Sequence, residues 1–239
     1  MSEPEIILYG SRLSPFVEKV ARGLMIKRLS FRVVEPASPL DFARWNPVTK
    51  KIPVLEIDGE KIWDSTRILR RLDELRAQPA LLSDDPATAA RQRLLEDWAD
   101  ESLYWYAMAI RWSSANAATT AAQLSASLTP LLRPLAQFVL PWQIGGTTKA
   151  QGLGRFPQAE LAVEFRSLLD DLVLQLGDRR FFFSDQPSRA DLALYGQFAF
   201  LRTEASPEAA AELEERPALL QFMQRLETAT EEAGATAGA

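Results

Sequence analysis

Residues 46–65 have the sequence NPVTKKIPVLEIDGEKIWDS, in which two short apolar runs flank the dipeptide Asp58-Gly59. Asp-Gly between such runs is the strongest short-range signal for a β-hairpin. Asp64-Ser65 follows at once, and both residue types favour the N-cap position of a helix. The apolar residues beyond them recur at helical spacing. The stretch therefore predicts two paired strands that lead directly into an amphipathic helix.

The same mixture of strands and helices extends back to the N-terminus. One apolar run ends at Gly10, and a second segment is β-branched and aromatic, and both patterns are typical of buried strands. A helix that starts at Pro15 is expected between them. The predicted order β-α-β-α-β-β-α comprises strand 6–9, helix 15–29, strand 31–34, helix 40–45, strands 54–57 and 61–63, and helix 64–75.

The pattern changes after a connector at residues 77–84, because only helical spacing follows. Prolines and a Gly-Gly pair in 120–150 indicate helices that are short, kinked or interrupted there. We therefore predict a mixed domain over residues 1–78, an all-helical domain over 85–232 and a disordered tail at 233–239. The helices expected in the second domain are 86–116, 159–176, 188–201 and 217–229.

Composition excludes several kinds of chemistry. The chain has 239 residues, 47% of them hydrophobic, a net charge of −5, and neither cysteine nor histidine. Disulfides, thiol nucleophiles and Ser-His-Asp triads are therefore impossible, and no metal site is expected. The acidic balance argues against a nucleic-acid partner. An acidic start and the lack of a long apolar stretch predict a cytoplasmic protein without membrane contact.

Three motifs together resemble the cytosolic glutathione transferase superfamily. They are LYGSRLSPFVEKV at residues 8–20, the stretch at 46–65 and FFFSDQPSRADLALY at 181–195, and the first two are most similar to the serine-type tau class. The resemblance implies an α/β thioredoxin-like N-terminal domain joined to an all-α C-terminal domain. It also implies a homodimeric enzyme that uses glutathione as co-substrate against a small hydrophobic electrophile.

Ser14 is the residue to which the resemblance assigns activation of the glutathione thiol. A free thiol has a pKa of about 8.5, and lowering it by two units needs about 2.7 kcal/mol of thiolate stabilisation. A hydroxyl donor at a helix N-terminus supplies such stabilisation through a hydrogen bond and the helix dipole. Ser14 precedes Pro15 at the predicted helix start. The alternatives are that Ser14 only caps this helix, or that Ser11 activates the thiol.

Two further pairs of residues are expected to bind glutathione. In the family the bond between Ile52 and Pro53 is cis, and the backbone of Ile52 pairs with the cysteinyl part of glutathione as an added strand does. Asp64 and Ser65, at a helix N-terminus, suit the γ-glutamyl carboxylate and ammonium groups. Both pairs also have a purely structural interpretation, as a strand entry and as an N-cap.

Basic residues near the predicted site are candidates for binding the glycyl carboxylate. Lys51 is preferred over Lys50 because it is adjacent to Ile52. The loop EPASPL at 35–40 has Ala37 where the tau class usually has a basic residue. Arg12 is a possible substitute for that charge.

Trp98, Trp105 and Trp112 lie seven residues apart in the first long helix of the second domain. This spacing keeps them near one side of the helix, so they form either an aromatic core or a subunit contact. Alternatively, Trp105 and Trp112 line an electrophile pocket beside Ser14, together with Tyr104 and Met108.

Two functions are consistent with these features. The first is a glutathione transferase, and the lack of cysteine at position 14 argues against the thioltransferase branch, which needs a protein thiol. The second is a transferase-like binding or interaction module with little or no catalysis.

Overall fold

The N-terminal part has the predicted order of strands and helices. The computed structural model describes residues 4–235. Its first seven elements are β1 (Ile6–Tyr9), α1 (Pro15–Ile26), β2 (Arg32–Val34), α2 (Pro39–Trp45), β3 (Val54–Ile57), β4 (Glu60–Trp63) and α3 (Ser65–Leu75). The hairpin of β3 and β4 turns at Asp58 and Gly59, both with positive φ, as the Asp-Gly signal predicts.

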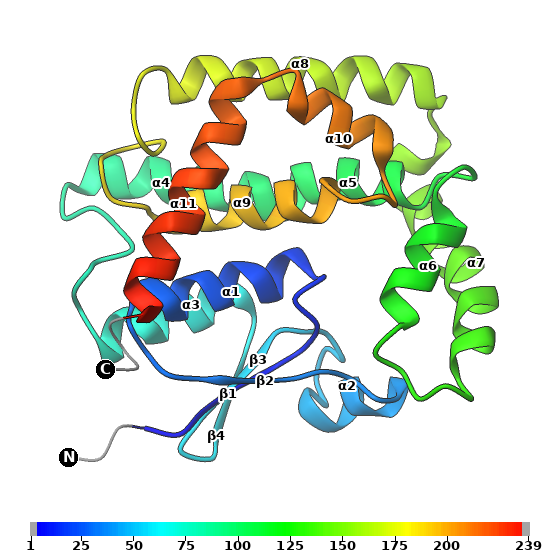
Figure 1. Cartoon of the computed structure of the whole chain (residues 1–239), viewed down its shortest axis with the longest axis horizontal. Coiled ribbons are helices and arrows are strands. Elements are labelled where there is room, and N and C mark those ends of the chain that lie inside the picture. Colours follow the sequence, from blue (N-terminus) through cyan, green and yellow to red (C-terminus); the bar gives the residue numbers. More distant parts are fainter. Residues whose placement is uncertain (1–3, 236–239) are drawn as a thin grey trace.

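The four strands form one mixed sheet in the order β2-β1-β3-β4. Strand β1 is parallel to β2, to which α1 makes the crossover, and antiparallel to β3. Helices α1 and α3 lie between the sheet and the helices of the second part (Figure 1). The fold is therefore the expected α/β thioredoxin-like domain with an all-α domain packed on its helical face. The shared core includes Leu8, Val20, Leu24, Leu55, Leu69, Leu192 and Phe198.

The second part is helical throughout. Its elements are α4 (Pro86–Trp98), a π-helical turn (Ala99–Leu103), α5 (Tyr104–Arg111), α6 (Ala117–Ser125), α7 (Arg133–Gln151), a 3-10 turn (Leu153–Arg155), α8 (Gln158–Leu176), α9 (Arg189–Leu201), α10 (Pro207–Glu214) and α11 (Pro217–Ala235). Helix α9 is buried along almost its whole length. Among residues 4–235, no helix has the length and apolar character that crossing a membrane requires.

Two helices of the second part have well-defined ends. Helix α9 starts with a capping box, in which the Ser188 hydroxyl donates to Asp191 at 2.6 Å, and α8 ends at Gly177 with a positive φ. The first long helix is shorter than expected, because it ends at Arg111 instead of residue 116. Of the tail expected to be disordered, residues 233–235 belong to α11 and residues 236–239 lie outside the described part.

Helix α7 differs from the expectation of short, kinked or interrupted helices in 120–150, because its 19 residues continue through Pro141. Proline inside a helix costs about 3 kcal/mol. On either side of Pro141, the half-buried Leu140 and Ile144 pack against the hydrophobic core, and this apolar contact acts against the cost. Pro134 lies in the first turn, where no backbone N–H is needed.

Candidate functional site

The register of the sheet brings three predicted site segments to one edge. Tyr9 at the end of β1 pairs with Val54 at the start of β3, and Val54 pairs with Trp63 at the end of β4. The residues just beyond these positions are Gly10, Pro53 and Asp64, so the loop before α1, the loop before β3 and the N-terminus of α3 are neighbours. Segments more than fifty residues apart therefore share one site.

Gly10 is required for the close contact between two of these segments. Its φ is +138°, and a Cβ atom there would lie 2.6 Å from Val17 Cγ2 and 3.2 Å from the Ile52 side chain. Any larger residue would push the loop before α1 away from the loop before β3.

Ser14 occupies the N-cap position of α1, as predicted. Its φ of −78° and ψ of 130° are extended, and its carbonyl accepts the first helical bond from the Glu18 N–H at 3.0 Å. Among residues 4–235 its hydroxyl makes no capping hydrogen bond. The half-buried hydroxyl is thus free to donate to a ligand at the positive end of the helix dipole. The interpretation that Ser14 only caps the helix finds no support in this geometry.

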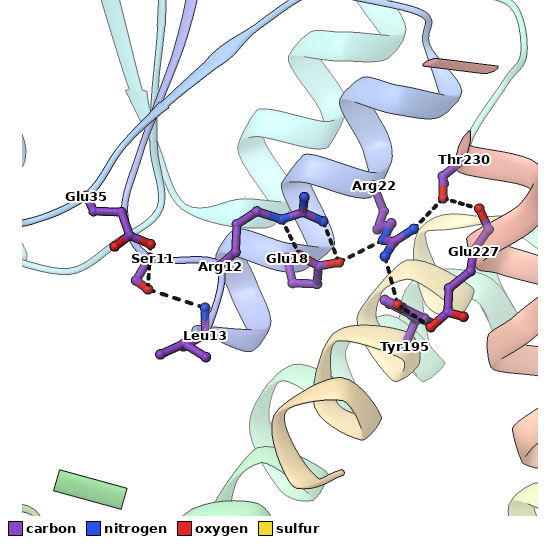
Figure 2. A network of polar contacts seen from close by, with 9 residues as sticks. All are labelled: Ser11, Arg12, Leu13, Glu18, Arg22, Glu35, Tyr195, Glu227 and Thr230. Atoms are coloured by element: carbon purple, nitrogen blue, oxygen red, sulfur yellow. Dashed lines mark hydrogen bonds and ion pairs between the residues drawn. The ribbon is translucent and has the colours of Figure 1, made fainter. Parts of the chain in front are cut away.

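Ser11 has a different environment. Its hydroxyl donates to Glu35 at 3.1 Å and lies 3.4 Å from the Leu13 N–H (Figure 2). A hydroxyl that already donates to a carboxylate must break that bond before it can stabilise a thiolate. The geometry therefore favours Ser14 over Ser11.

The bond between Ile52 and Pro53 is cis, as expected from the family resemblance. Within the described residues, neither the N–H nor the C=O of Ile52 makes a backbone hydrogen bond. Both groups are available to an extended ligand backbone. Asn46, which the sequence analysis missed, holds this loop, because its side-chain amide donates to Thr49 Oγ1 at 2.6 Å and to the Lys51 carbonyl at 3.1 Å. The Asn-Pro signal at 46–47 indicates such a turn.

Asp64 and Ser65 lie at the start of α3, and the N-cap interpretation of Asp64 is confirmed. Its carboxylate accepts a hydrogen bond from the Arg67 N–H at 3.0 Å. Asp64 has a φ of +83°, an unusual conformation for a residue with a side chain. Such outliers concentrate at functional sites. Ser65 is buried at the first helical position, next to backbone N–H groups that have no partner inside the helix.

The basic residues near the site differ in whether their charged groups are exposed or already bound to another residue. Lys50 and Lys51 are exposed in the loop that Asn46 organises. Ala37 does not provide a charge; its carbonyl instead accepts hydrogen bonds from Thr129 N–H and Oγ1, at 3.0 and 3.3 Å. The turn between α6 and α7 is thereby attached beside α2.

Arg12 is already ion-paired. It donates through Nε and Nη2 to the two oxygens of Glu18, at 2.6 and 2.8 Å, and Glu18 also accepts from Arg22 at 2.7 Å (Figure 2). Arg22 in turn donates to the hydroxyl of Tyr195 on α9 and to Thr230 on α11. Arg12 thus connects the loop of Ser11 and Ser14 to the helical domain, and it is not a free substitute for the charge absent at position 37.

A second polar cluster lies beneath the site. Lys19 of α1 is fully buried, and its ammonium group is 2.7 Å from Glu96 of α4 and 2.6 Å from Asp100 of the π-helical turn. Thr66, adjacent to Ser65, donates to Glu96 at 2.9 Å. Burial raises the pKa of Asp100 to about 6 even though Lys19 acts to lower it. The cluster joins α1, α3 and α4 directly behind both helix N-termini of the site.

Aromatic side chains adjoin the start of α1. The ring of Phe16 lies 4.9 Å from that of Tyr104, which lies 5.4 Å from that of Trp105. These three side chains are only partly buried, whereas Met108 and Trp112 are buried. Tyr104 and Trp105 remain candidates for lining an electrophile pocket, while Trp112 belongs to the core.

The position of Ser14 also depends on a residue that the sequence analysis did not identify. Gly196 of α9 packs against the backbone of Pro15, and a Cβ atom there would lie 2.3 Å from the Pro15 carbonyl oxygen. Because this contact joins two backbones, a side chain at 196 cannot be accommodated by a rotamer change. No local pattern signals it, since glycine inside a helix is otherwise only a propensity cost.

Gly196→Ala is therefore expected to displace the N-terminus of α1. We expect a stability loss of about 1–3 kcal/mol from overpacking, together with loss of any activity that depends on the Ser14 hydroxyl. Chemical unfolding and the activity assay described below measure the two effects.

Gly23→Ala on α1 is the matched control. A Cβ atom there would meet the end of a flexible side chain, Leu69 Cδ2, at 2.4 Å. Both substitutions gain a similar amount of helix propensity, so they differ mainly in what the new methyl group contacts. Equal losses in the two variants would contradict the role given to Gly196.

Comparison with known families agrees with this architecture. Residues 8–80 match the family model for the glutathione S-transferase N-terminal domain, and residues 165–226 match that for its C-terminal domain. Together these matches cover more than half of the chain and include all three segments of the sheet edge. The chain belongs to the glutathione S-transferase family.

Curated members of the family match part of the chain. Glutathione S-transferase U9 of Arabidopsis thaliana is 31% identical over 106 residues, which are 43% of this chain and 44% of that relative. A probable glutathione S-transferase of Solanum tuberosum is 36% identical over 101 residues, 41% of this chain and 46% of the relative. The matched region thus spans less than half the length of these relatives.

Solved structures share the fold along almost the whole chain. β-Etherase LigF from Sphingobium sp. strain SYK-6 has a TM-score of 0.70 at 20% identity, with 97% of this chain and 99% of that chain covered. The tau-class glutathione S-transferase of mango, Mangifera indica, has a TM-score of 0.61 at 21% identity, with 98% and 97% covered. At such identities the likeness concerns the fold.

Proposed function

We propose that this protein is a glutathione transferase in which the Ser14 hydroxyl stabilises the glutathione thiolate. The observation that carries the proposal is the Ser14 hydroxyl at the N-terminus of α1, which makes no capping hydrogen bond to the described residues. It lies on the same sheet edge as Ile52, whose backbone groups make no backbone hydrogen bond within residues 4–235. A thiolate next to this hydroxyl gains a charge-assisted hydrogen bond and the helix dipole.

The remaining site residues have complementary roles in this proposal. The backbone N–H and C=O of Ile52, before Pro53, pair with the cysteinyl residue. Ser65 and the N-terminus of α3 receive the γ-glutamyl carboxylate, because unpaired N–H groups at a helix start bind anions. Asp64 faces the γ-glutamyl ammonium, and Lys51 faces the glycyl carboxylate.

The reaction needs no protein nucleophile. The thiolate sulfur attacks an electrophilic carbon, the bond from that carbon to its leaving group breaks, and the thiol proton is released to solvent. The rings of Phe16, Tyr104 and Trp105 adjoin the start of α1, which favours a small aromatic electrophile over an aliphatic one. The pKa of Tyr104 is raised to about 12, chiefly by burial, so its phenol stays protonated and does not act as a base at neutral pH.

The test combines binding and turnover in the full chain. We expect calorimetric binding of glutathione, a thiolate absorption band at neutral pH in the complex, and conjugation of an aryl halide. Binding without a thiolate band or turnover would overturn catalysis and favour a transferase-like binding module. Absence of both binding and turnover would overturn the whole proposal.

A further inference from the structure

Ser14 stands at the end of a short turn that other parts of the chain hold in place. The Ser14 N–H donates to the Ser11 carbonyl at 2.9 Å, so residues 11–14 form a β-turn with Arg12 and Leu13 at its centre. Both central residues are exposed, and exposed turns are more mobile than the elements they connect. The position of the Ser14 hydroxyl therefore depends on the side-chain contacts of this turn.

Glu18 holds the turn at two points. Its carboxylate accepts two hydrogen bonds from Arg12, and its backbone N–H donates to the Ser14 carbonyl at 3.0 Å. Two parallel bonds between a guanidinium and a carboxylate fix orientation as well as distance. Only 8% of the Glu18 side chain is exposed, which makes these bonds stronger than bonds at the surface. A rotation of the Glu18 side chain would therefore move the turn.

Arg22, one helical turn after Glu18, fixes the orientation of this carboxylate. Its Nε donates to Glu18 at 2.7 Å, its Nη2 to the Tyr195 hydroxyl at 2.8 Å and its Nη1 to the Thr230 hydroxyl at 2.5 Å (Figure 2). The Tyr195 hydroxyl in turn donates to Glu227 at 2.8 Å. A planar guanidinium that is bound through all three nitrogens has one orientation. We term the connected residues the Arg22 network, which consists of Arg12, Glu18, Arg22, Tyr195, Glu227 and Thr230.

The far end of the Arg22 network lies on helices α9 and α11. Tyr195 of α9 and Thr230 of α11 are only 3% and 0% exposed, and close packing leaves such side chains little freedom to move. The residue after Tyr195 is Gly196, which contacts the backbone of Pro15. The C-terminal helices therefore hold the start of α1 in two ways, through this backbone contact and through the Arg22 network.

We propose that Glu18 and Arg22 are positioning residues for Ser14, and that Thr230 of α11 sets their orientation. These residues act through the turn at 11–14 and do not contact glutathione. A functional group must be held within about 0.5 Å of its working position, and the Arg22 network extends this restraint from α11 to Arg12. The inference rests on the proposed function, because its main readout is ionisation of the thiol that Ser14 stabilises.

The first experiment measures the pKa of the thiol in the glutathione complexes of Glu18→Gln and Thr230→Val. Both substitutions nearly keep the shape of the side chain, and each weakens one connection of the Arg22 network. We expect the thiol pKa to rise by about 0.5–1 unit, which lowers the thiolate fraction below that pKa about three- to tenfold. The thiolate absorbance as a function of pH measures this shift. Conjugation rates of variant and wild type should converge above the raised pKa.

Two matched controls separate positioning from a general loss of packing. Glu212 of α10 is also bound by two arginines, Arg166 and Arg216, and Glu212→Gln should leave the thiol pKa unchanged. Thr228 lies on α11 two residues before Thr230, is exposed, and donates to a carbonyl of its own helix. Thr228→Val should also leave the thiol pKa unchanged.

The second experiment needs no ligand. Amide hydrogen exchange in the chain without glutathione measures local opening of residues 10–16. Glu18→Gln and Thr230→Val should speed exchange in this segment at least about threefold, whereas the two control variants should not. Arg12 and Thr230 lie at opposite ends of the Arg22 network. The double variant Arg12→Met/Thr230→Val should therefore show less than the sum of the two single effects, because both substitutions interrupt the same series of bonds.

The results distinguish failure of this inference from failure of the proposed function. If the wild-type complex shows a thiolate band and the thiol pKa is unchanged in both Glu18→Gln and Thr230→Val, the positioning role is wrong and the role of Ser14 stands. Equal pKa shifts in Thr228→Val and Thr230→Val would also overturn the inference. A wild-type chain that binds no glutathione would overturn the proposed function and this inference together.

Discussion

Ser14→Ala is expected to lower conjugation by about 10- to 100-fold near pH 6.5, with little change in stability. A hydrogen bond to a charged group is worth about 1.5–3 kcal/mol, so its loss raises the pKa of the bound thiol by about one to two units. Stability should hold because, in the part of the chain that the structure describes, the half-buried Ser14 hydroxyl makes no capping bond that the variant would lose. The measurements are the rate and the thiolate absorbance of the glutathione complex as functions of pH.

The pH profile separates this role from a merely structural one. Above the raised thiol pKa, glutathione ionises without help, so the rates of variant and wild type should converge there. Ser11→Ala is the control, because the Ser11 hydroxyl is engaged with Glu35, and a shift of less than half a unit is expected. A thiol pKa that is unchanged in Ser14→Ala and raised in Ser11→Ala would transfer the role to Ser11.

Lys19→Met is expected to have the largest effect on stability, about 3–5 kcal/mol at neutral pH. Removing one partner of a buried ion pair leaves an uncompensated charge, and here two carboxylates, Glu96 and Asp100, lose their cation. Their side chains are only 3% and 12% exposed, so water cannot replace the lost ammonium group. Urea unfolding at several pH values measures the deficit.

The loss of stability in Lys19→Met should become smaller as the pH falls. In the folded variant, burial without the opposing effect of Lys19 raises the pKa of Asp100 further above its value in the unfolded chain. Folding then takes up protons, so stability falls as the pH rises through this window and recovers as the pH falls. The stability deficit of Lys19→Met should therefore shrink toward about pH 4.5, where the buried Asp100 carboxyl group is protonated.

Lys27→Met is the matched control for this experiment. Lys27 is also fully buried, and it is 2.7 Å from Asp73. Asp73 is 22% exposed and keeps a second partner, Arg189, at 2.6 Å. Lys27 also donates to the backbone carbonyls of Arg76, Ala77 and Pro79, which do not titrate, so the stability deficit of Lys27→Met should be nearly independent of pH. A deficit in Lys19→Met that does not vary with pH would show loss of packing instead of unpaired charge.

Much of the fold was predictable because its signals are local. The Asp58-Gly59 turn, the N-cap at Asp64 and the capping box of Ser188 each depend on residues within a few positions of one another. The continuity of α7 was not predictable, because the cost of Pro141 is local while the contacts of Leu140 and Ile144 that act against this cost are made with the hydrophobic core.

Some residues of the candidate site could also be predicted from local signals, and others could not. Residues 11–14, 52–53 and 64–65 could be found from motifs, because each motif is a short segment with its own backbone requirement. The roles of Gly196 and of the ion pairs of Lys19 could not be predicted from motifs. Both depend on contacts between residues more than seventy positions apart in the sequence. An apolar neighbourhood around Lys19 on its helix is the one local signal that it is buried.

By itself, the sequence determined that this protein contains no thiol or imidazole, that a strand-turn-strand-helix unit follows residue 50, and that a serine precedes the first helix. These properties depend on composition and on neighbouring residues. Only the tertiary structure decided that, within residues 4–235, the Ser14 hydroxyl makes no capping hydrogen bond while the Ser11 hydroxyl donates to Glu35, and that large apolar side chains of α7 are exposed. Hydrogen-bond partners and burial depend on which distant segments pack together, and local sequence does not encode that choice.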